Sequence, residues 1–256
     1  MTTVYAEPAM MDHAAWQGWA EMLPEPTLVA VSHGTGDRAG RDAVKGLVDA
    51  VGTAMGDTPV HGAFVDVEHP RAGRFVRSGV LGPDASAVLV PLLLSAGTHA
   101  SGDLAEAAAL RPGTRVARPL GPATGLAVVL RRRLLEAGWV PGEPVILACA
   151  GSTDPAGVAD CRTMAQLLAG HLQVPVTAAF ISAAEPRLGA TINAARTHNP
   201  GVRTAVSTYL LAPGHFADLA AGCAPDVLGK PLLVPGENPP QELVDMVVKR
   251  YRQAIA

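Results

Sequence analysis

Short apolar runs alternate with longer segments of helical periodicity from residue 27 to the end of the chain. This alternation is typical of an α/β fold with parallel sheets. A first series predicts strands at 27–32, 59–67, 86–94 and 114–119, and helices at 38–54, 70–79, 101–110 and 122–137. A second series predicts strands at 145–150, 174–182, 203–211 and 227–234, and helices at 155–170, 186–197, 215–222 and 239–254.

The two series share residues as well as a pattern, which indicates an internal duplication. The matching segments are 60–64 with 176–180, Pro70-Arg71 with Pro186-Arg187, and the segment ending at His99 with the one ending at His215. We therefore predict an α/β protein of two similar domains, each a four-stranded parallel sheet of order 2-1-3-4 flanked by helices. The predicted first half is 27–140 and the second is 144–256, with a Pro- and Gly-containing linker at 139–144.

Residues 1–26 lie outside the repeat and form a predicted N-terminal extension. Within it, Trp16, Trp19 and Met22 could share one face of a short docking helix.

Composition indicates a soluble globular chain, since 48% of the 256 residues are hydrophobic and the net charge is −3. A nucleic-acid or membrane-surface protein would usually carry a basic patch. The three cysteines have no C-x-x-C spacing, which argues against a disulfide framework or a structural zinc site. The N-terminus lacks the basic and apolar regions of a signal peptide, and no apolar run is long enough to cross a bilayer. We expect a cytoplasmic protein.

The candidate chemistry lies where predicted strands end. His33 follows the first strand and His99 follows the third, so the order 2-1-3-4 places both at the switch point of the sheet, where ligands of open α/β sheets bind. Asp66 lies near the end of the second strand and could bring a carboxylate to the same edge. Two imidazoles and a carboxylate suit a borderline divalent ion such as Co²⁺, Fe²⁺, Ni²⁺ or Zn²⁺.

Each of these residues also has a simpler interpretation. A histidine at a strand end is often a capping residue, and Asp66 alone is a solvated side chain. The segment His33-Gly34-Thr35-Gly36 could instead be an anion-binding loop before a helix. It lacks the full G-x-G-x-x-G motif and has no Walker lysine, which argues against a nucleotide site.

The second half is altered at the same positions. Ala150 replaces the first histidine, Ser182 replaces the aspartate, and His215 remains without those partners. We therefore expect the second half to be a degenerate scaffold and the chain to have one active site. Two fused halves could face each other across one cleft, so we expect a monomer with two pseudo-symmetric halves.

The motifs resemble those of the class II chelatases, in the two-domain form of the sirohydrochlorin chelatase family. The resemblance rests on His33-Gly34-Thr35, on Phe64-Val65-Asp66 and on the run PLLLSAGTHASGDL at 91–104. It implies an enzyme that inserts a divalent metal into sirohydrochlorin without ATP, in siroheme or cobalamin biosynthesis. The resemblance does not choose among Fe²⁺, Co²⁺ and Ni²⁺, and we favour Fe²⁺ because the sequence has no His-rich metal-storage tract. The chain departs from the family where Gly102 and His69 replace a histidine and a glutamate, and where Asp66 replaces a frequent glutamate.

The resemblance implies His33 and His99 as the functional histidines. Metal insertion removes two pyrrole protons and delivers a desolvated cation, and a neutral imidazole can serve either step. We expect His33 and His99 to hold the metal and accept protons, with Asp66 completing the metal shell or orienting an imidazole. No permanently bound cofactor is expected. Arginines on helices that start at this edge are candidates for the carboxylates of the tetrapyrrole, namely Arg38, Arg41, Arg71, Arg74 and Arg77.

Two other functions remain open at this point. One is a non-catalytic carrier of a tetrapyrrole or metal that uses the same residues. The other is a hydrolase or phosphoryl-transfer enzyme with His33 as base, although no nucleophile motif such as G-x-S-x-G is present.

Overall fold

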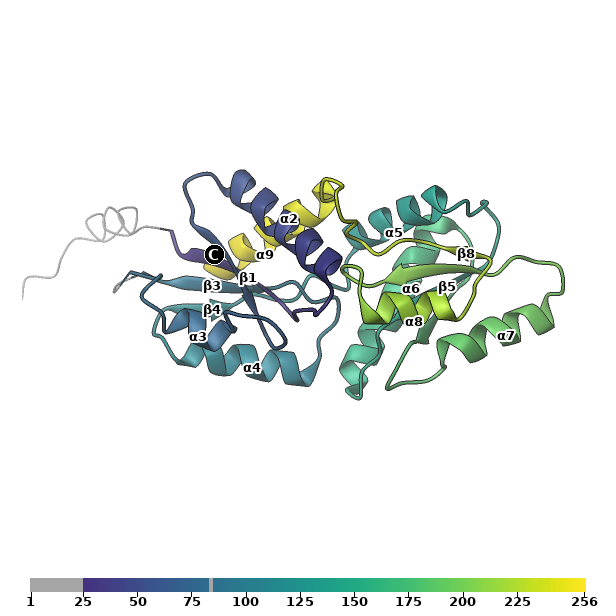
Figure 1. Cartoon of the computed structure of the whole chain (residues 1–256), viewed down its shortest axis with the longest axis horizontal. Coiled ribbons are helices and arrows are strands. Elements are labelled where there is room, and N and C mark those ends of the chain that lie inside the picture. The colour runs from purple at the N-terminus through teal and green to yellow at the C-terminus, as the bar shows by residue number, and fades with distance from the viewer. Residues whose placement is uncertain (1–24, 83–84) are drawn as a thin grey trace, which may run out of the picture.

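The computed structural model describes residues 25–82 and 85–256, with the backbone alone at residues 98–101. Two α/β halves lie side by side (Figure 1). The prediction of a docking helix at Trp16, Trp19 and Met22 falls outside the described residues. Elements of the first half are β1 (Thr27–Ser32), α2 (Arg38–Met55), β2 (Val60–Phe64), α3 (Ala72–Val76), β3 (Ala87–Pro91), α4 (Thr98–Ala109), β4 (Thr114–Val116) and α5 (Thr124–Glu136).

The second half repeats this order of elements. They are β5 (Val145–Cys149), α6 (Pro155–Leu172), β6 (Val176–Phe180), α7 (Leu188–His198), β7 (Ala205–Tyr209), α8 (His215–Gly222), β8 (Val227–Leu228) and α9 (Gln241–Ile255). Every strand and helix predicted for the two halves is present in the predicted order. Among the described residues, no helix has the length and apolar character that crossing a membrane requires.

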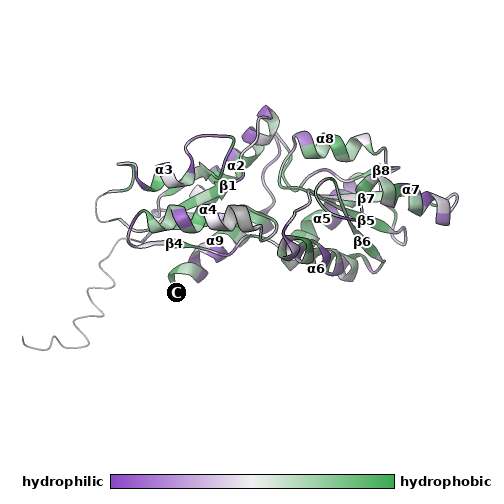
Figure 2. Cartoon of the chain, turned by 90° about the horizontal axis from the view of Figure 1, so that it is seen from below, coloured by the Kyte–Doolittle hydropathy of each residue, from purple (hydrophilic) through white to green (hydrophobic). Residues whose placement is uncertain are grey.

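Both sheets are four-stranded and parallel, with the orders β2-β1-β3-β4 and β6-β5-β7-β8. The predicted fold class and strand order are therefore confirmed. The central strands are buried on both faces, as parallel strands covered by helices must be, and Figure 2 colours them mostly as hydrophobic. Along β1, Leu28 and Ala30 face one core while Val29 and Val31 face another, which is the two-residue alternation of a strand.

The two halves exchange their last helices. Helix α9 packs against α2 and β3 of the first sheet, whereas α5 packs against α6 and β7 of the second sheet. Tyr251 of α9 fixes this arrangement by donating a hydrogen bond of 2.6 Å to the carbonyl of Pro26, just before β1. One continuous hydrophobic core consequently contains residues of both sheets, for example Leu28, Leu130, Leu147 and Val247.

The predicted division of the chain at residues 140–144 follows the sequence repeat. Helices α5 and α9, however, each pack against the sheet on the other side of this division. The predicted linker is itself a packed turn. The Trp139 side chain is buried, and its Nε1 donates a hydrogen bond of 3.0 Å to the carbonyl of Glu143. The Glu143 carboxylate accepts hydrogen bonds from Arg203 of the second half, at 2.8 and 3.0 Å. Hydrogen bonding to this guanidinium lowers the pKa of Glu143.

The boundary between the halves has approximate twofold symmetry. A Cβ built on Gly40, in the first turn of α2, would lie 2.5 Å from the carbonyl oxygen of Pro213 in the second half. At the equivalent position of α6, a Cβ on Gly157 would lie 3.1 Å from the carbonyl oxygen of Ala96 in the first half. Each half therefore presses the loop after its third strand against a helix start of the other half.

Polar contacts hold the same boundary. The Tyr209 hydroxyl donates a hydrogen bond of 2.6 Å to the carbonyl of Leu94, and the amide of Ala96 donates one of 2.7 Å to the Asp160 carboxylate. Burial raises the pKa of Tyr209 well above its usual value, so the hydroxyl stays protonated and able to donate. The relative position of the halves is thus fixed by backbone contacts as well as by the shared core.

The contact at Gly40 gives a test of this interlocking. Gly40→Ala places a methyl group against backbone oxygen, and we expect the free energy of unfolding to fall by about 1–3 kcal/mol, the usual range for overpacking. The matched control is Gly170→Ala in α6, where a Cβ meets nothing within 4 Å. Replacing an unhindered helical glycine should leave stability unchanged or raise it by about 0.5–1 kcal/mol. Urea unfolding measures both, and equal stability of the two variants would show that the halves do not interlock at Gly40.

Candidate active site

His33 lies directly after β1, at the carboxyl edge of the first sheet, and its side chain is exposed. The loop from His33 to Asp37 leads into α2, whose start is capped by Asp37 through a hydrogen bond of 2.7 Å from the amide of Gly40. Gly34 has a φ of +92°. A Cβ at this position would lie 3.2 Å from the amide nitrogen of Glu68, so a glycine lets the His33 loop lie close against the next loop.

The loops after β1 and β2 are bonded to each other. The amide of Asp66 donates a hydrogen bond of 3.1 Å to the carbonyl of His33. The amide of Thr35 donates one of 2.8 Å to Oε1 of Glu68. Glu68 was not among the predicted site residues, because nothing in the spacing of acidic residues shows that its carboxylate closes on a loop more than thirty positions away. The backbone position of His33 is therefore well defined by its neighbours.

Asp66 is in the loop after β2 and not at the end of the strand. The predicted strand 59–67 pairs only over Val60–Phe64, and the chain turns at Val67, whose φ is +25°. Oδ1 of Asp66 lies 2.8 Å from Nη2 of Arg71, and both side chains are 58% exposed. In this structure the carboxylate is therefore engaged by a guanidinium, and any metal ion would have to compete with it.

His99 is the second residue of α4 and not part of a loop, because the helix begins earlier than the predicted 101. Strand β3, which precedes it, is hydrogen bonded to β1. The backbone of His99 and the His33 loop therefore lie at the same sheet edge, at the switch point where β1 is flanked by β2 and β3. Among the side chains that the structure describes, which exclude that of His99, no three His, Cys, Asp or Glu residues form a metal-binding group.

The second half keeps the loop framework without the reactive groups. The amide and the hydroxyl of Ser182 each donate a hydrogen bond of 2.9 Å to the carbonyl of Ala150, which matches the bond between Asp66 and His33. Asp154 caps α6 as Asp37 caps α2. The same backbone geometry thus carries an imidazole and a carboxylate in one half, and a methyl and a hydroxyl in the other.

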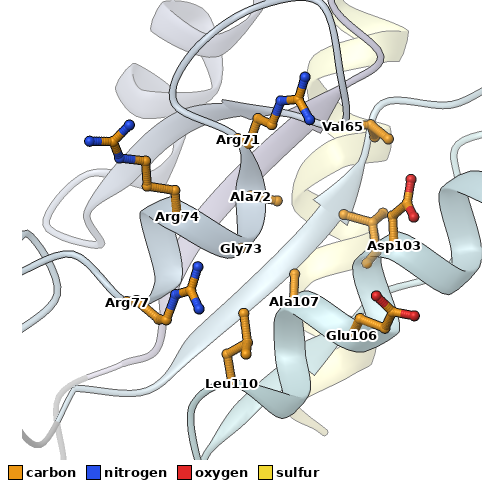
Figure 3. Close-up of a pocket in the computed structure, with 11 residues that line it drawn as sticks. Val65, Arg71, Ala72, Gly73, Arg74, Arg77, Asp103, Glu106, Ala107 and Leu110 are labelled. Carbon is orange, nitrogen blue, oxygen red and sulfur yellow. The ribbon is translucent and has the colours of Figure 1, made fainter.

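The five candidate arginines separate into two groups. Arg71, Arg74 and Arg77 line a cavity of about 330 Å³ between α3 and α4, and Asp103 and Glu106 line its opposite side (Figure 3). Apolar residues also line this cavity, among them Val65, next to Asp66.

Arg38 and Arg41 lie outside that cavity. Arg38 is 90% exposed, with its Nε 3.8 Å from Oδ2 of Asp42. Arg41 donates hydrogen bonds of 3.3 and 2.9 Å to the carbonyls of Thr35 and Gly36, and it thereby supports the His33 loop. A second cavity of about 450 Å³ lies between α2 and β2 and is lined by Arg41, Lys45, His61 and Glu68 among others.

The chain matches the CbiX family model over residues 27–137 and 144–219. No curated protein sequence matches it. Among solved structures, SirB from Bacillus subtilis with Fe³⁺ is similar, with a TM-score of 0.72 and 22% identity over 91% of this chain and 96% of SirB.

Two further structures have the same fold. The sirohydrochlorin chelatase SirB from Bacillus subtilis subspecies spizizenii, in complex with cobalt, has a TM-score of 0.67 and 21% identity over 90% of this chain and 95% of that one. DR2241 from Deinococcus radiodurans, a multi-domain protein with structural similarity to chelatases, has a TM-score of 0.61 and 18% identity over 91% of this chain and 56% of its own. The family match extends across both halves, and the chain therefore belongs to the CbiX family and has the two-half fold of SirB.

Proposed function

We propose that this protein is a sirohydrochlorin chelatase that inserts a divalent metal ion, Fe²⁺ or alternatively Co²⁺, into sirohydrochlorin without ATP. One observation carries the proposal: the His33 loop is bonded to the Asp66 loop at the switch point of the sheet, and the backbone of His99 lies at that same edge. Membership of the CbiX family supports it. The structurally similar SirB is described as a sirohydrochlorin chelatase, and its structures contain Fe³⁺ or cobalt.

The metal ion is a substrate in this reaction. We propose that His33 and His99 bind it through imidazole nitrogen, which suits Fe²⁺ and Co²⁺, and that Asp66 supplies an oxygen or orients a histidine. His33 is exposed and free to turn toward an incoming ion. Asp66 takes part once its 2.8 Å contact with Arg71 opens, because one oxygen of an exposed ion pair exchanges partners at low energetic cost.

We further propose that the tetrapyrrole carboxylates bind near α3. Arg71, Arg74 and Arg77 provide guanidinium groups around one cavity, and guanidinium pairs well with carboxylate. Arg71 belongs to both sites, since it lines this cavity and also contacts Asp66. Arg38 and Arg41 are weaker candidates. Arg38 lies close to the carboxylate of Asp42, and Arg41 donates hydrogen bonds to carbonyls of the His33 loop.

We propose that the protein works as a monomer, and that it does so in the cytoplasm. The exchanged helices α5 and α9 give the two halves one core, so the second half already supplies the wall that a single-domain chain would gain by dimerising.

The decisive assay follows the absorption spectrum of sirohydrochlorin during incubation with purified protein and Co²⁺ or, anaerobically, Fe²⁺. A chelatase accelerates the spectral change over the protein-free rate with many turnovers per chain. A carrier binds the tetrapyrrole at a one-to-one ratio without turnover. A hydrolase changes neither rate nor spectrum. The last two results would each overturn the proposed function.

Removing either imidazole should abolish catalysis. We expect His33→Ala and His99→Ala to lower turnover to near the uncatalysed rate, because each removes a nitrogen ligand, while thermal stability stays within about 1–2 °C of the parent protein. His171→Ala, an exposed histidine near the end of α6, is the control and should keep full activity. Near-normal turnover of either first variant would show that the site is assigned wrongly.

Asp66 should matter less than the histidines. We expect Asp66→Asn to lower activity by roughly 10–100-fold, the usual effect of losing a group that supports metal ligands. Asp66→Glu should retain substantial activity, because the carboxylate is preserved. Steady-state rates over a metal titration distinguish the outcomes. An Asp66→Asn variant as inactive as His33→Ala would make the carboxylate an essential ligand, and a fully active one would make it a bystander.

The contact between Arg71 and Asp66 predicts an effect on how tightly the protein binds a metal ion when no tetrapyrrole is present. Arg71→Gln frees the carboxylate, and we expect Co²⁺ affinity in the absence of tetrapyrrole to rise up to about fivefold, since an exposed ion pair is worth no more than about 1 kcal/mol. Arg187→Gln changes the equivalent arginine of the second half, where Ser182 replaces the aspartate, and should have no effect. Isothermal titration calorimetry measures both, and unchanged or weaker binding by Arg71→Gln would contradict competition for Asp66.

A further inference from the structure

His215, in the second half, lies beside the His33 loop of the first half. It is the first residue of α8, and the preceding Gly214 approaches the first half closely. A Cβ built on Gly214 would be 3.2 Å from Oγ1 of Thr35 and 3.5 Å from Cβ of Asp37. The carbonyl of Pro213 contacts Gly40 at the start of the helix that follows this loop. The interlocked boundary therefore brings the start of α8, and with it His215, next to the His33 loop.

The His215 side chain is exposed and available. Its ring meets the edge of the Phe216 ring, with centroids 5.8 Å apart. Within the part of the chain that the structure describes, no hydrogen-bond or ion-pair partner of this imidazole is found. Leu219 shares this face of α8, one turn further on, and Phe216 and Leu219 are 39% and 43% exposed. The imidazole of His215 therefore has no polar partner among the described residues. It lies beside exposed apolar side chains on α8, and the start of α8 adjoins the His33 loop.

Metal insertion needs a base that is not already a ligand. A macrocycle loses two N–H protons for each divalent ion that it takes up, and an imidazole nitrogen whose lone pair is on the metal cannot accept a proton. Of the other groups of the first half near His33, Asp66 is assigned above to the metal ion or to orienting a histidine, and Oε1 of Glu68 accepts a hydrogen bond from Thr35. His61 is the second residue of β2 and therefore lies away from the carboxyl edge of the sheet.

We propose that His215 is the proton acceptor of the reaction and acts on the face of the macrocycle turned toward the second half; this rests on the proposed function. The lone pair of neutral His215 takes a pyrrole N–H proton, the N–H electron pair stays on nitrogen and binds the metal, and the imidazolium returns the proton to water. His215 does this once for each of the two protons. Because the metal approaches from the first half, proton and metal do not compete for one side of the ring.

His69 is the alternative base, as it is an exposed imidazole. It belongs to the same loop as Asp66, however, and so lies on the side from which the metal enters. Phe216 and Leu219 further favour His215, because exposed apolar side chains beside it can cover the flat face of a macrocycle. This proposal gives the second half a catalytic residue, whereas the sequence led us to expect only a scaffold. That expectation rested on residues of the second half alone, in which Ala150 and Ser182 leave His215 without partners.

The test compares His215→Ala, His69→Ala and the control His171→Ala at saturating metal, with sirohydrochlorin and Co²⁺. We expect His215→Ala to lower kcat by roughly 100-fold, the lower end for general base catalysis, while Co²⁺ affinity and melting temperature stay unchanged. Added imidazole should restore part of the lost kcat to His215→Ala and leave the wild type and His171→Ala unaffected. His215→Gln, which keeps the size of the side chain but is not a base, should be as slow as His215→Ala and serves if the alanine variant does not fold.

The outcomes separate this proposal from the proposed function. Normal kcat in His215→Ala or His215→Gln, rescue confined to His69→Ala, or a loss of kcat that imidazole does not restore would each overturn the role of His215. In all of these cases the wild type would still insert metal. Absence of turnover by the wild type would instead overturn the function itself.

Discussion

The exchange of the last helices makes the two halves of this protein one structural unit. Because α5 covers the second sheet and α9 covers the first, residues of both sheets enter a single hydrophobic core. Glycines at the starts of α2 and α6 then allow each helix to meet a backbone carbonyl of the other half. Close backbone contact of this kind leaves little freedom to slide or hinge, so the sheet edges that carry the strand-end loops are held at a fixed separation. Everything proposed for the active site depends on that separation.

The two halves share a loop framework but differ in the side chains that it carries. Both halves use the same loop hydrogen bonds, between Asp66 and His33 in one and between Ser182 and Ala150 in the other. The backbone framework is therefore independent of the side chains that it displays, and a half could lose its imidazole and carboxylate without losing its fold. The second half retains His215 on an exposed and partly apolar helix, and the role that we propose for it depends on the contact of the neighbouring Gly214 with the His33 loop.

The sequence was sufficient to predict the order of the elements, the strand orders and the sheet edge that carries the histidines. These features follow from the periodicity of neighbouring residues and from the geometry of adjacent parallel strands. Predicting them requires no knowledge of contacts between distant parts of the chain. The ends of strands were less predictable. Apolar residues continue to Val67, but pairing stops at Phe64 where the chain turns, and Asp66 consequently lies in a loop.

Long-range partners could not be predicted. An amphipathic helix needs an apolar surface, and its pattern does not specify which of two similar sheets provides it, so the exchange of α5 and α9 leaves no local signal. The bond between Thr35 and Glu68 and the contact between Asp66 and Arg71 depend on how loops close in three dimensions. From the sequence we expected His215 to have no role, because the second half lacks the other site residues. In the structure the loop that precedes His215 contacts Thr35 and Asp37 of the first half.

The proposed chemistry requires one metal site per chain at the first sheet edge, between His33 and His99. Anomalous diffraction at the cobalt edge, from crystals soaked in Co²⁺, tests it directly. We expect a single anomalous peak, in contact with the imidazoles of His33 and His99 and within reach of Asp66, and no peak coordinated by His215. A peak bound by His215, or a peak that persists unchanged in crystals of His33→Ala, would contradict it.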